Sequence, residues 1–171
     1  MPRRIVFVCT GNSCRSPLAE VLARARYADL PLIFASAGTD AVAGQPASPE
    51  ACAVATGRGL DLGGHRATPL DAASLAGAVW VIGMTRAHVA LLRARLSPAW
   101  PGRVGLLGLP GFDWRTGRTA TDAAAAGGLE VPDPWQQPPE RYGAVAALID
   151  RWLLAWHDVF AEASAGKDCP E

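Results

Sequence analysis

Short apolar runs alternate along this chain with segments in which apolar residues recur every three or four positions. The runs at residues 4–8, 32–35, 78–82 and 104–107 are typical of buried strands, and the periodic segments between and after them are typical of amphipathic helices. This alternation predicts an α/β fold with one four-stranded parallel sheet flanked by helices on both faces. In such a fold, functional residues are expected at the carboxyl ends of the strands.

Two serine–proline pairs mark the expected beginnings of helices. Ser16-Pro17 and Ser48-Pro49 each combine a residue suited to the N-cap with a proline suited to the first helical position. Glu20 would then lie in the first turn of the earlier helix, where an acidic side chain is favourable. A single long helix is expected from Pro138-Pro139 to Phe160. Its expected buried stripe consists of Tyr142, Val145, Ile149, Trp152, Leu153, Trp156 and Phe160.

The segment of residues 108–137 follows neither the strand nor the helix period. It is rich in glycine and is interrupted by Pro110, Pro132 and Pro134. A loop of about thirty residues inside a compact domain is usually functional or disordered. The segment is therefore a place to look for functional residues.

The composition excludes several classes of protein. The 171 residues carry 16 Lys and Arg against 16 Asp and Glu, a balance that argues against nucleic-acid binding through a basic field. The longest uncharged stretch, residues 72–85, is shorter than the roughly 18–20 residues that span a bilayer. No signal peptide is visible and four cysteines do not make a disulfide framework, so a cytoplasmic protein is expected. The length fits one domain, residues 1–163, followed by a tail at residues 164–171.

The most informative segment directly follows the first expected strand and reads Cys-Thr-Gly-Asn-Ser-Cys-Arg-Ser-Pro from Cys9 to Pro17. Its glycine and asparagine permit backbone N–H groups to turn inward as an anion nest, and the following helix adds its own free N–H groups. Arg15 supplies a planar fork that can bind two phosphate oxygens. Such surroundings favour the nucleophilic thiolate at Cys9, to which Ser16 could donate a hydrogen bond. The segment therefore predicts nucleophilic attack on phosphorus.

Cys52 and Arg58 are separated by five residues, as Cys9 and Arg15 are, but this second Cys-x5-Arg pair lacks the surroundings of the first. It lies on the helix expected from Pro49 onward, where no strand-to-helix turn can shape a loop. Cys52 is therefore expected to be a small residue of the core.

The segment from Cys9 to Pro17 resembles the active-site loop of the low-molecular-weight protein phosphatases, the small protein-tyrosine phosphatases. It also resembles that of their relatives, the bacterial protein-arginine phosphatases and the thioredoxin-coupled arsenate reductases. Residues 36–38 (Ser-Ala-Gly), His65-Arg66 and residues 133–135 (Asp-Pro-Trp) are similar to further motifs of this family. The resemblance covers most of the chain and implies the fold expected above. For His65 it implies a structural role near the site.

Cleavage of a phosphate ester also needs an acid to protonate the leaving group. Asp113, Asp122 and Asp133 are the candidates in the irregular segment, and Asp133 is favoured because its two proline neighbours restrict the backbone and because of the family's Asp-Pro-aromatic motif. In the expected cycle Cys9 attacks phosphorus, Asp133 protonates the leaving group, and water then hydrolyses the phosphocysteine. No metal or cofactor is expected, since the cysteines and histidines lack ligand spacing.

The expected site thus combines three catalytic residues with a set that binds substrate. The catalytic residues are Cys9, Arg15 and Asp133. The substrate-binding residues are Thr10, Gly11, Asn12, Ser13, Cys14, Ser16 and Trp135. For Cys14 the family resemblance also implies a reversible disulfide with Cys9 that protects the nucleophile from over-oxidation.

The expected partner is a phosphorylated protein or peptide, with phosphate or another oxyanion in the cysteine loop. Phosphotyrosine is the favoured substrate because Trp135 offers a flat wall for a phenyl ring. Ser13 favours the alternative, phosphoarginine, because tyrosine-selective members carry Ile or Leu at this position and arginine-phosphate members carry Thr. Arsenate reduction is less favoured, since Cys52 and Cys169 do not match the spacing of the relay cysteines in those relatives. A non-catalytic phosphate-binding module would lack the nucleophile or the acid.

Overall fold

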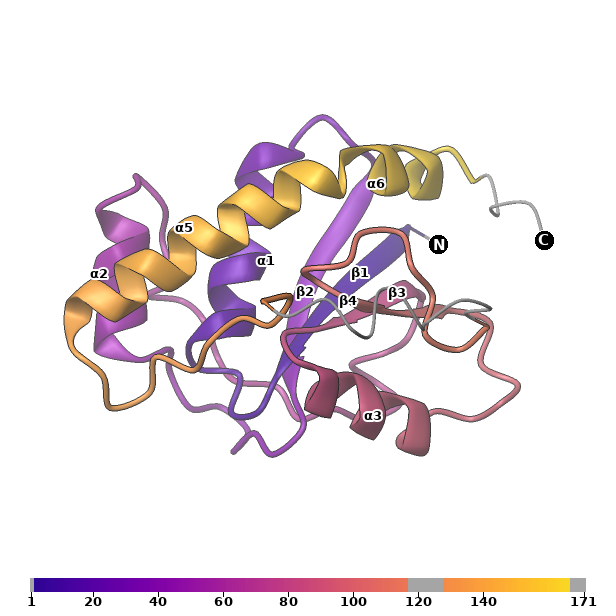
Figure 1. The fold of residues 1–171 in the computed structure, drawn as a ribbon, viewed down its shortest axis with the longest axis horizontal. Coiled ribbons are helices and arrows are strands. Elements are labelled where there is room, and N and C mark those ends of the chain that lie inside the picture. The colour runs from indigo at the N-terminus through magenta and orange to yellow at the C-terminus, as the bar shows by residue number, and fades with distance from the viewer. Residues whose placement is uncertain (1, 117–127, 167–171) are drawn as a thin grey trace.

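The four expected strands form one parallel sheet in the computed structural model, which describes residues 2–116 and 128–166 (Figure 1). The strand order is β2-β1-β3-β4, so the first strand lies in the interior of the sheet. All three strand pairs are parallel. The strands are β1 (Arg3–Cys9), β2 (Leu32–Gly38), β3 (Ala78–Gly83) and β4 (Arg103–Leu106).

Helices cover both faces of the sheet, as the sequence predicts (Figure 1). They are α1 (Arg15–Arg26), α2 (Pro49–Thr56), α3 (Arg86–Arg95), α5 (Pro139–Ala155) and α6 (His157–Ser164). Ile5 and Phe7 of β1 pack with apolar residues of α1, α2, α5 and α6, whereas Val6 and Val8 pack with α3. The alternation of side chains along one strand thus builds two separate cores on the two faces.

The prediction that Ser16 caps the first helix is wrong. The helix begins at Arg15, its N-cap position is Cys14, and no side chain caps it. The hydroxyl of Ser16 is instead buried beside Cys9 and Ala37. Glu20 consequently lies beyond the first turn, and it forms an ion pair with Arg24. The second serine–proline pair behaves as predicted, because Ser48 Oγ accepts a hydrogen bond from the N–H of Ala51.

The single closing helix of the sequence prediction is two helices, α5 and α6, which meet at Trp156. The indole Nε1 of this fully buried tryptophan donates a hydrogen bond to the backbone oxygen of Leu107, at 2.8 Å. The predicted stripe is buried except at Trp152, which is half-buried. The anchoring of Trp156 to the end of β4 explains why the chain bends where the sequence shows no helix breaker.

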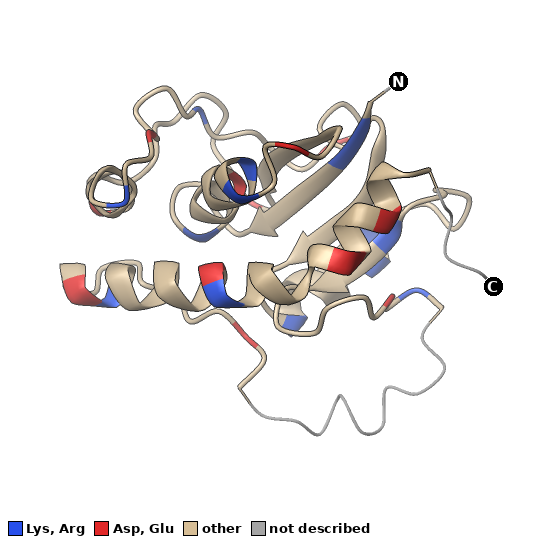
Figure 2. Cartoon of the chain, turned by 90° about the horizontal axis from the view of Figure 1, so that it is seen from above, with Lys and Arg blue, Asp and Glu red and all other residues tan. Residues whose placement is uncertain are grey.

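The irregular segment contains neither helix nor strand in its described parts, residues 108–116 and 128–137. Asp122 lies outside the described residues, and so does most of the expected tail, including Cys169. Basic and acidic residues are interspersed over the described chain (Figure 2). None of the described helices has both the length and the apolar character that crossing a bilayer requires.

Candidate active site

The cysteine loop, residues 9–15, connects the carboxyl end of β1 to the first residue of α1. Asn12 has a φ of 52°, a left-handed backbone conformation that asparagine tolerates better than most residues. Gly38, at the end of β2, lies directly against the loop: a Cβ atom there would be 2.4 Å from the backbone oxygen of Thr10. The glycine of the Ser-Ala-Gly motif therefore permits a close approach of two backbones.

The thiol of Cys9 is buried, and its Sγ lies 3.0 Å from Ser16 Oγ. The Ser16 oxygen accepts a hydrogen bond from Asn12 Nδ2, at 2.9 Å. Its single hydroxyl proton can therefore point either to Cys9 or to the backbone oxygen of Ala37, at 3.3 Å. This arrangement places a donor beside the sulfur, as the sequence predicts.

Asn12 connects the loop to two distant segments. Its Nδ2 also donates to Ser36 Oγ, at 2.9 Å, and its Oδ1 accepts from the N–H of Thr68, at 2.8 Å. His65 Nε2 donates to the backbone oxygen of Asn12, at 2.8 Å. A carbonyl can only accept, so this bond fixes the proton of a neutral His65 on Nε2. The structural role expected for His65 is therefore a direct hydrogen bond to the loop.

Arg15 and Asp133 meet although one follows β1 and the other lies in the irregular segment. Arg15 Nη2 is 2.9 Å from Asp133 Oδ2, and Arg15 Nη1 donates to the backbone oxygen of Val131, at 3.3 Å. The Arg15 side chain is 6% exposed, whereas that of Asp133 is 53% exposed. Asp133 Oδ1 accepts from the N–H of Trp135, which keeps the two motif residues in one turn.

A hollow of about 410 Å³ opens above the loop. Its lining includes Cys9, Thr10, Gly11, Ser13, Cys14, Arg15, Asp133 and Trp135, and adds Asp40, Val42 and Gln45 from the segment after β2. Of the predicted site residues, Asn12 and Ser16 do not line it, because both are fully buried. The three residues after β2 carry no motif, so their place in the site could not be predicted from the sequence.

The side chain of Cys14, a residue of the loop, contacts two buried hydroxyl groups from other segments. Its Sγ is 3.4 Å from Ser48 Oγ and 3.9 Å from the hydroxyl of Tyr142. Burial raises the pKa of Tyr142 to about 12, and neighbouring Cys14 adds to the effect. Cys9 and Cys14 are both free thiols in this structure.

The second Cys-x5-Arg pair does not form a loop. Cys52 is half-buried on α2 and packs against the core, as predicted, while Arg58 forms an ion pair with Asp150, at 3.8 Å. Asp113 accepts hydrogen bonds from the N–H groups of Val104 and Arg115, outside the hollow. Among the described residues, no group of three or more His, Cys, Asp or Glu side chains is arranged to bind a metal ion.

His88 is a residue of the site that sequence reasoning missed. It is 4% exposed, and its two ring nitrogens lie 3.0 Å from Thr10 Oγ1 and 3.0 Å from Thr85 Oγ1. Burial, followed by the positive charge of Arg15, lowers the pKa of His88 to about 4. A neutral imidazole, with one donor and one acceptor, suits these two hydroxyl partners. No local signal could reveal the contact, because 78 residues separate His88 from Thr10.

Comparison with known proteins identifies the family to which this chain is similar. Residues 4–167 match the family model described as low molecular weight phosphotyrosine protein phosphatase. The chain is 32% identical over 156 residues to the low molecular weight protein-tyrosine-phosphatase Wzb of Salmonella typhimurium, covering 91% of this chain and 93% of that protein.

Solved structures show the same similarity. The low molecular weight protein tyrosine phosphatase from T. tengcongensis superposes with a TM-score of 0.75 at 30% identity, covering 92% of this chain and 99% of that one. The YwlE arginine phosphatase from Geobacillus stearothermophilus superposes with a TM-score of 0.75 at 26% identity, covering 99% and 100%. Fold and site thus define a small phosphatase built on a cysteine loop. The chain belongs to the low molecular weight phosphotyrosine protein phosphatase family.

Proposed function

We propose that this chain hydrolyses phosphotyrosine in proteins through a phosphocysteine intermediate. The observation that carries the proposal is that a nucleophile, a cationic fork and an acid from two distant segments line one hollow: Cys9, Arg15 and Asp133. A passive phosphate-binding site would need neither the buried thiol beside Ser16 nor a carboxyl group at the entrance.

The proposed reaction has two displacements at phosphorus. The Cys9 thiolate forms an S–P bond while the P–O bond to the tyrosine oxygen breaks, and Asp133 gives its proton to that oxygen. A water molecule then attacks phosphorus, the S–P bond breaks, and Asp133 takes a proton from the water. Arg15 and the loop N–H groups stabilise the equatorial oxygens, where negative charge develops.

The walls of the hollow support an aromatic substrate. Trp135 and Val42 both line it and are both strongly exposed, so their apolar surfaces are available to a ring that enters the hollow. Two relatives have solved complexes with oxyanion compounds: Wzb from Escherichia coli K30 with sulphate, and Wzb from Vibrio vulnificus with benzylphosphonate. Phosphate or another oxyanion is the ligand proposed for the cysteine loop, and the cytoplasm is the proposed location.

One observation favours a second candidate, phosphoarginine. Ser13 lines the hollow with a small hydroxyl group, and Asp40 adds a second carboxylate to the lining, besides that of Asp133. Two carboxylates would suit the positive guanidinium of a phosphoarginine better than a neutral phenyl ring. The similarity to an arginine phosphatase structure is compatible with this alternative.

Side-by-side turnover of phosphotyrosine and phosphoarginine peptides tests both candidates. The native chain should cleave the phosphotyrosine peptide with the higher kcat/KM, and Cys9→Ser should abolish turnover of both. Ser13→Ile should shift the ratio further toward phosphotyrosine, because it fills the space above the loop. Absence of turnover with both peptides would refute a phosphatase, and a higher kcat/KM for phosphoarginine would replace the first candidate by the second.

A further inference from the structure

A second hollow, the α5 groove, adjoins the candidate active site. It has a volume of about 620 Å³ and is lined by residues of α5 and of the stretch 132–137, which carries Asp133. Figure 1 shows this stretch leading into α5. Asp133 lines both this groove and the hollow above the cysteine loop. The two hollows therefore meet at the proposed acid, where the leaving group of a substrate would be.

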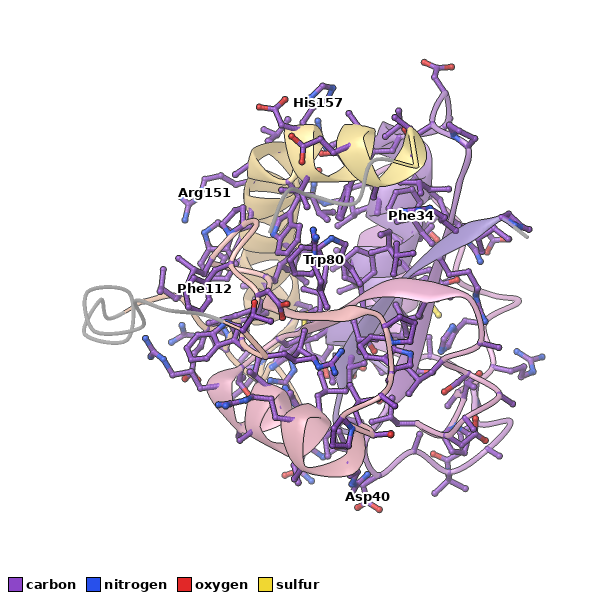
Figure 3. The ribbon with its side chains drawn as sticks, turned by 90° about the vertical axis from the view of Figure 1, so that its right-hand side faces the viewer. Phe34, Asp40, Trp80, Phe112, Arg151 and His157 are labelled. Carbon is purple, nitrogen blue, oxygen red and sulfur yellow. The ribbon has the colours of Figure 1, made fainter. Side chains whose placement is uncertain are left out.

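One face of α5 supplies the wall of the groove. Arg141, Ala144, Val145, Leu148 and Arg151 all line it, and their spacing of three and four residues places them on the same side of the helix. The centre of this face is apolar, and an arginine stands at each end. Both arginines are exposed, and Arg151 extends outward from the helix (Figure 3).

The unpaired charge of the groove is positive. Neither Arg141 nor Arg151 has an ion-pair partner among the described residues. Asp150, the acidic neighbour of Arg151 on α5, is paired with Arg26 at 2.5 Å, and Glu140, the acidic neighbour of Arg141, does not line the groove. Asp133, the acidic residue of the groove, is paired with Arg15. A ligand that complements the groove would carry apolar groups between negative ones.

The dimensions fit a short stretch of extended peptide. Arg141 and Arg151 are ten residues apart on α5, which corresponds to about 15 Å along a helix. An extended chain rises about 3.3 Å per residue, so four or five residues span this distance. A peptide whose phosphorylated side chain enters the hollow above Cys9 passes Asp133 and can continue into the groove.

We infer that the α5 groove is a substrate-recognition surface that binds the acidic and apolar residues flanking the phosphorylated residue of a protein substrate. This inference rests on the proposed phosphatase function. Neither Cys9 nor Arg15 lines the groove, so the groove contributes to KM for long substrates and leaves the chemical step to Cys9, Arg15 and Asp133.

The test compares peptides that differ only in the charge of their flanks. Phosphotyrosine peptides carry Asp and Glu before the phosphotyrosine, after it, or neither, with Asn and Gln in the neutral version and the same apolar residues throughout. For the native chain, one acidic version should have a KM about fivefold below the neutral one, a difference that shrinks at high salt. Para-nitrophenyl phosphate, which is too short to reach the groove, reports the chemistry alone.

Charge reversal identifies the residues responsible. Arg141→Glu and Arg151→Glu should each remove most of the preference for the acidic peptide and change kcat/KM for para-nitrophenyl phosphate less than twofold. Arg141→Lys and Arg151→Lys should retain the preference. Arg93→Glu, an exposed arginine on α3 at the other face of the sheet, is the matched control and should retain it too.

The outcomes separate the two proposals. If the native chain cleaves para-nitrophenyl phosphate but treats acidic and neutral peptides alike, the groove has no recognition role and the inference is overturned. The same holds if charge reversal weakens acidic and neutral peptides equally. If the native chain cleaves none of the phosphate esters, the phosphatase proposal itself fails. Should a Glu variant have a lowered melting temperature, Arg141→Gln and Arg151→Gln remove the charge with less perturbation, and the preference must still disappear.

Discussion

The guanidinium of Arg15 and the carboxylate of Asp133 form an ion pair at 2.9 Å, although 118 residues separate them in the sequence. This pair connects the two roles proposed for the site. In this contact Arg15 holds the carboxyl group that must supply a proton in the first chemical step. A substrate phosphate brings negative charge to Arg15 and competes with Asp133 for hydrogen bonds from the guanidinium group. We therefore expect phosphate binding to release the acid for its role.

Asp133→Asn separates proton donation from the contact with Arg15. The amide oxygen can still accept a hydrogen bond from Arg15, but the side chain cannot supply a proton to the leaving group. We expect kcat for phenyl phosphate to fall by roughly 10²–10⁴, with a smaller fall for para-nitrophenyl phosphate, whose leaving group needs less protonation. Steady-state kinetics with both esters checks this. The control, Asp113→Asn, should be near native, and the reverse result would assign the acid to Asp113.

Ser16→Ala tests the hydrogen bond to the nucleophile. A hydrogen bond to a charged group contributes about 1.5–3 kcal/mol, so loss of the hydroxyl 3.0 Å from Cys9 Sγ should lower kcat/KM by roughly 10- to 150-fold. Alkylation of Cys9 by iodoacetamide at pH 7 should slow as well. Ser74→Ala, in a turn that bonds to Asp71, is the matched control. Native alkylation and turnover in Ser16→Ala would exclude this role.

Gly38→Ala should distort the cysteine loop although it changes none of the loop's own residues. The added methyl group would lie 2.4 Å from the Thr10 oxygen and 2.9 Å from the Asn12 nitrogen, so the backbone must move. Overpacking of this kind costs about 1–3 kcal/mol. We expect a lower urea midpoint and at least a tenfold loss of kcat/KM. At Gly64 a Cβ meets nothing within 4 Å, so Gly64→Ala should behave as native. Equal behaviour of the two variants would contradict the close approach.

The burial of His88 makes the stability of the fold depend on pH. Its pKa falls from 6.5 to about 4 on folding, so the unfolded chain binds the proton more readily between these values. Above pH 6.5 His88 is neutral in both states, and the free energy of unfolding carries no penalty from it. As the pH falls, the unfolded chain is protonated first, and the free energy of unfolding decreases by on the order of 3 kcal/mol near pH 4. Urea unfolding at pH 7, 5.5 and 4.5 measures it. His88→Gln should flatten the profile, whereas His157→Gln, at an exposed position, should keep the native slope.

The presence of Cys14 in the loop leads us to expect that activity recovers after oxidation of Cys9. Peroxide converts the Cys9 thiolate to a sulfenic acid, and attack by the Cys14 sulfur then forms a disulfide and releases water. Native enzyme inactivated by peroxide should regain activity with dithiothreitol, and Cys14→Ser should lose it irreversibly. Cys52→Ser should recover like the native chain, since Cys52 lies outside the hollow. Full recovery of Cys14→Ser would show that another group protects the nucleophile.

The elements that the sequence predicts well are those whose signals are local. Each strand is a short apolar run, and the cysteine loop carries its glycine, asparagine and arginine within seven residues. The prediction of Asp133 needed its proline neighbours and the family motif, since its partner Arg15 is far away in the sequence.

The features that were missed depend on contacts across the fold. Ser16 has the residue type of an N-cap, but the contact with Cys9 and the strand β2 decides its role. The bend at Trp156 depends on the oxygen of Leu107, and the burial of His88 depends on Thr10. Helix periodicity and cap preferences contain no information about such distant partners.

The hydrogen bond from Trp156 to Leu107 bears on how much the length of the irregular segment can vary. Leu107 immediately precedes the irregular segment, and the N–H of Val131 near its end bonds to the Met84 oxygen, at 2.9 Å. The second of these hydrogen bonds fixes the backbone two residues before Asp133. Because the entropy of closing a loop grows only with the logarithm of its length, we expect a longer or shorter connection between these two hydrogen bonds to change the closure entropy little. We therefore expect Asp133 to keep its position in variants whose connecting segment has a different length.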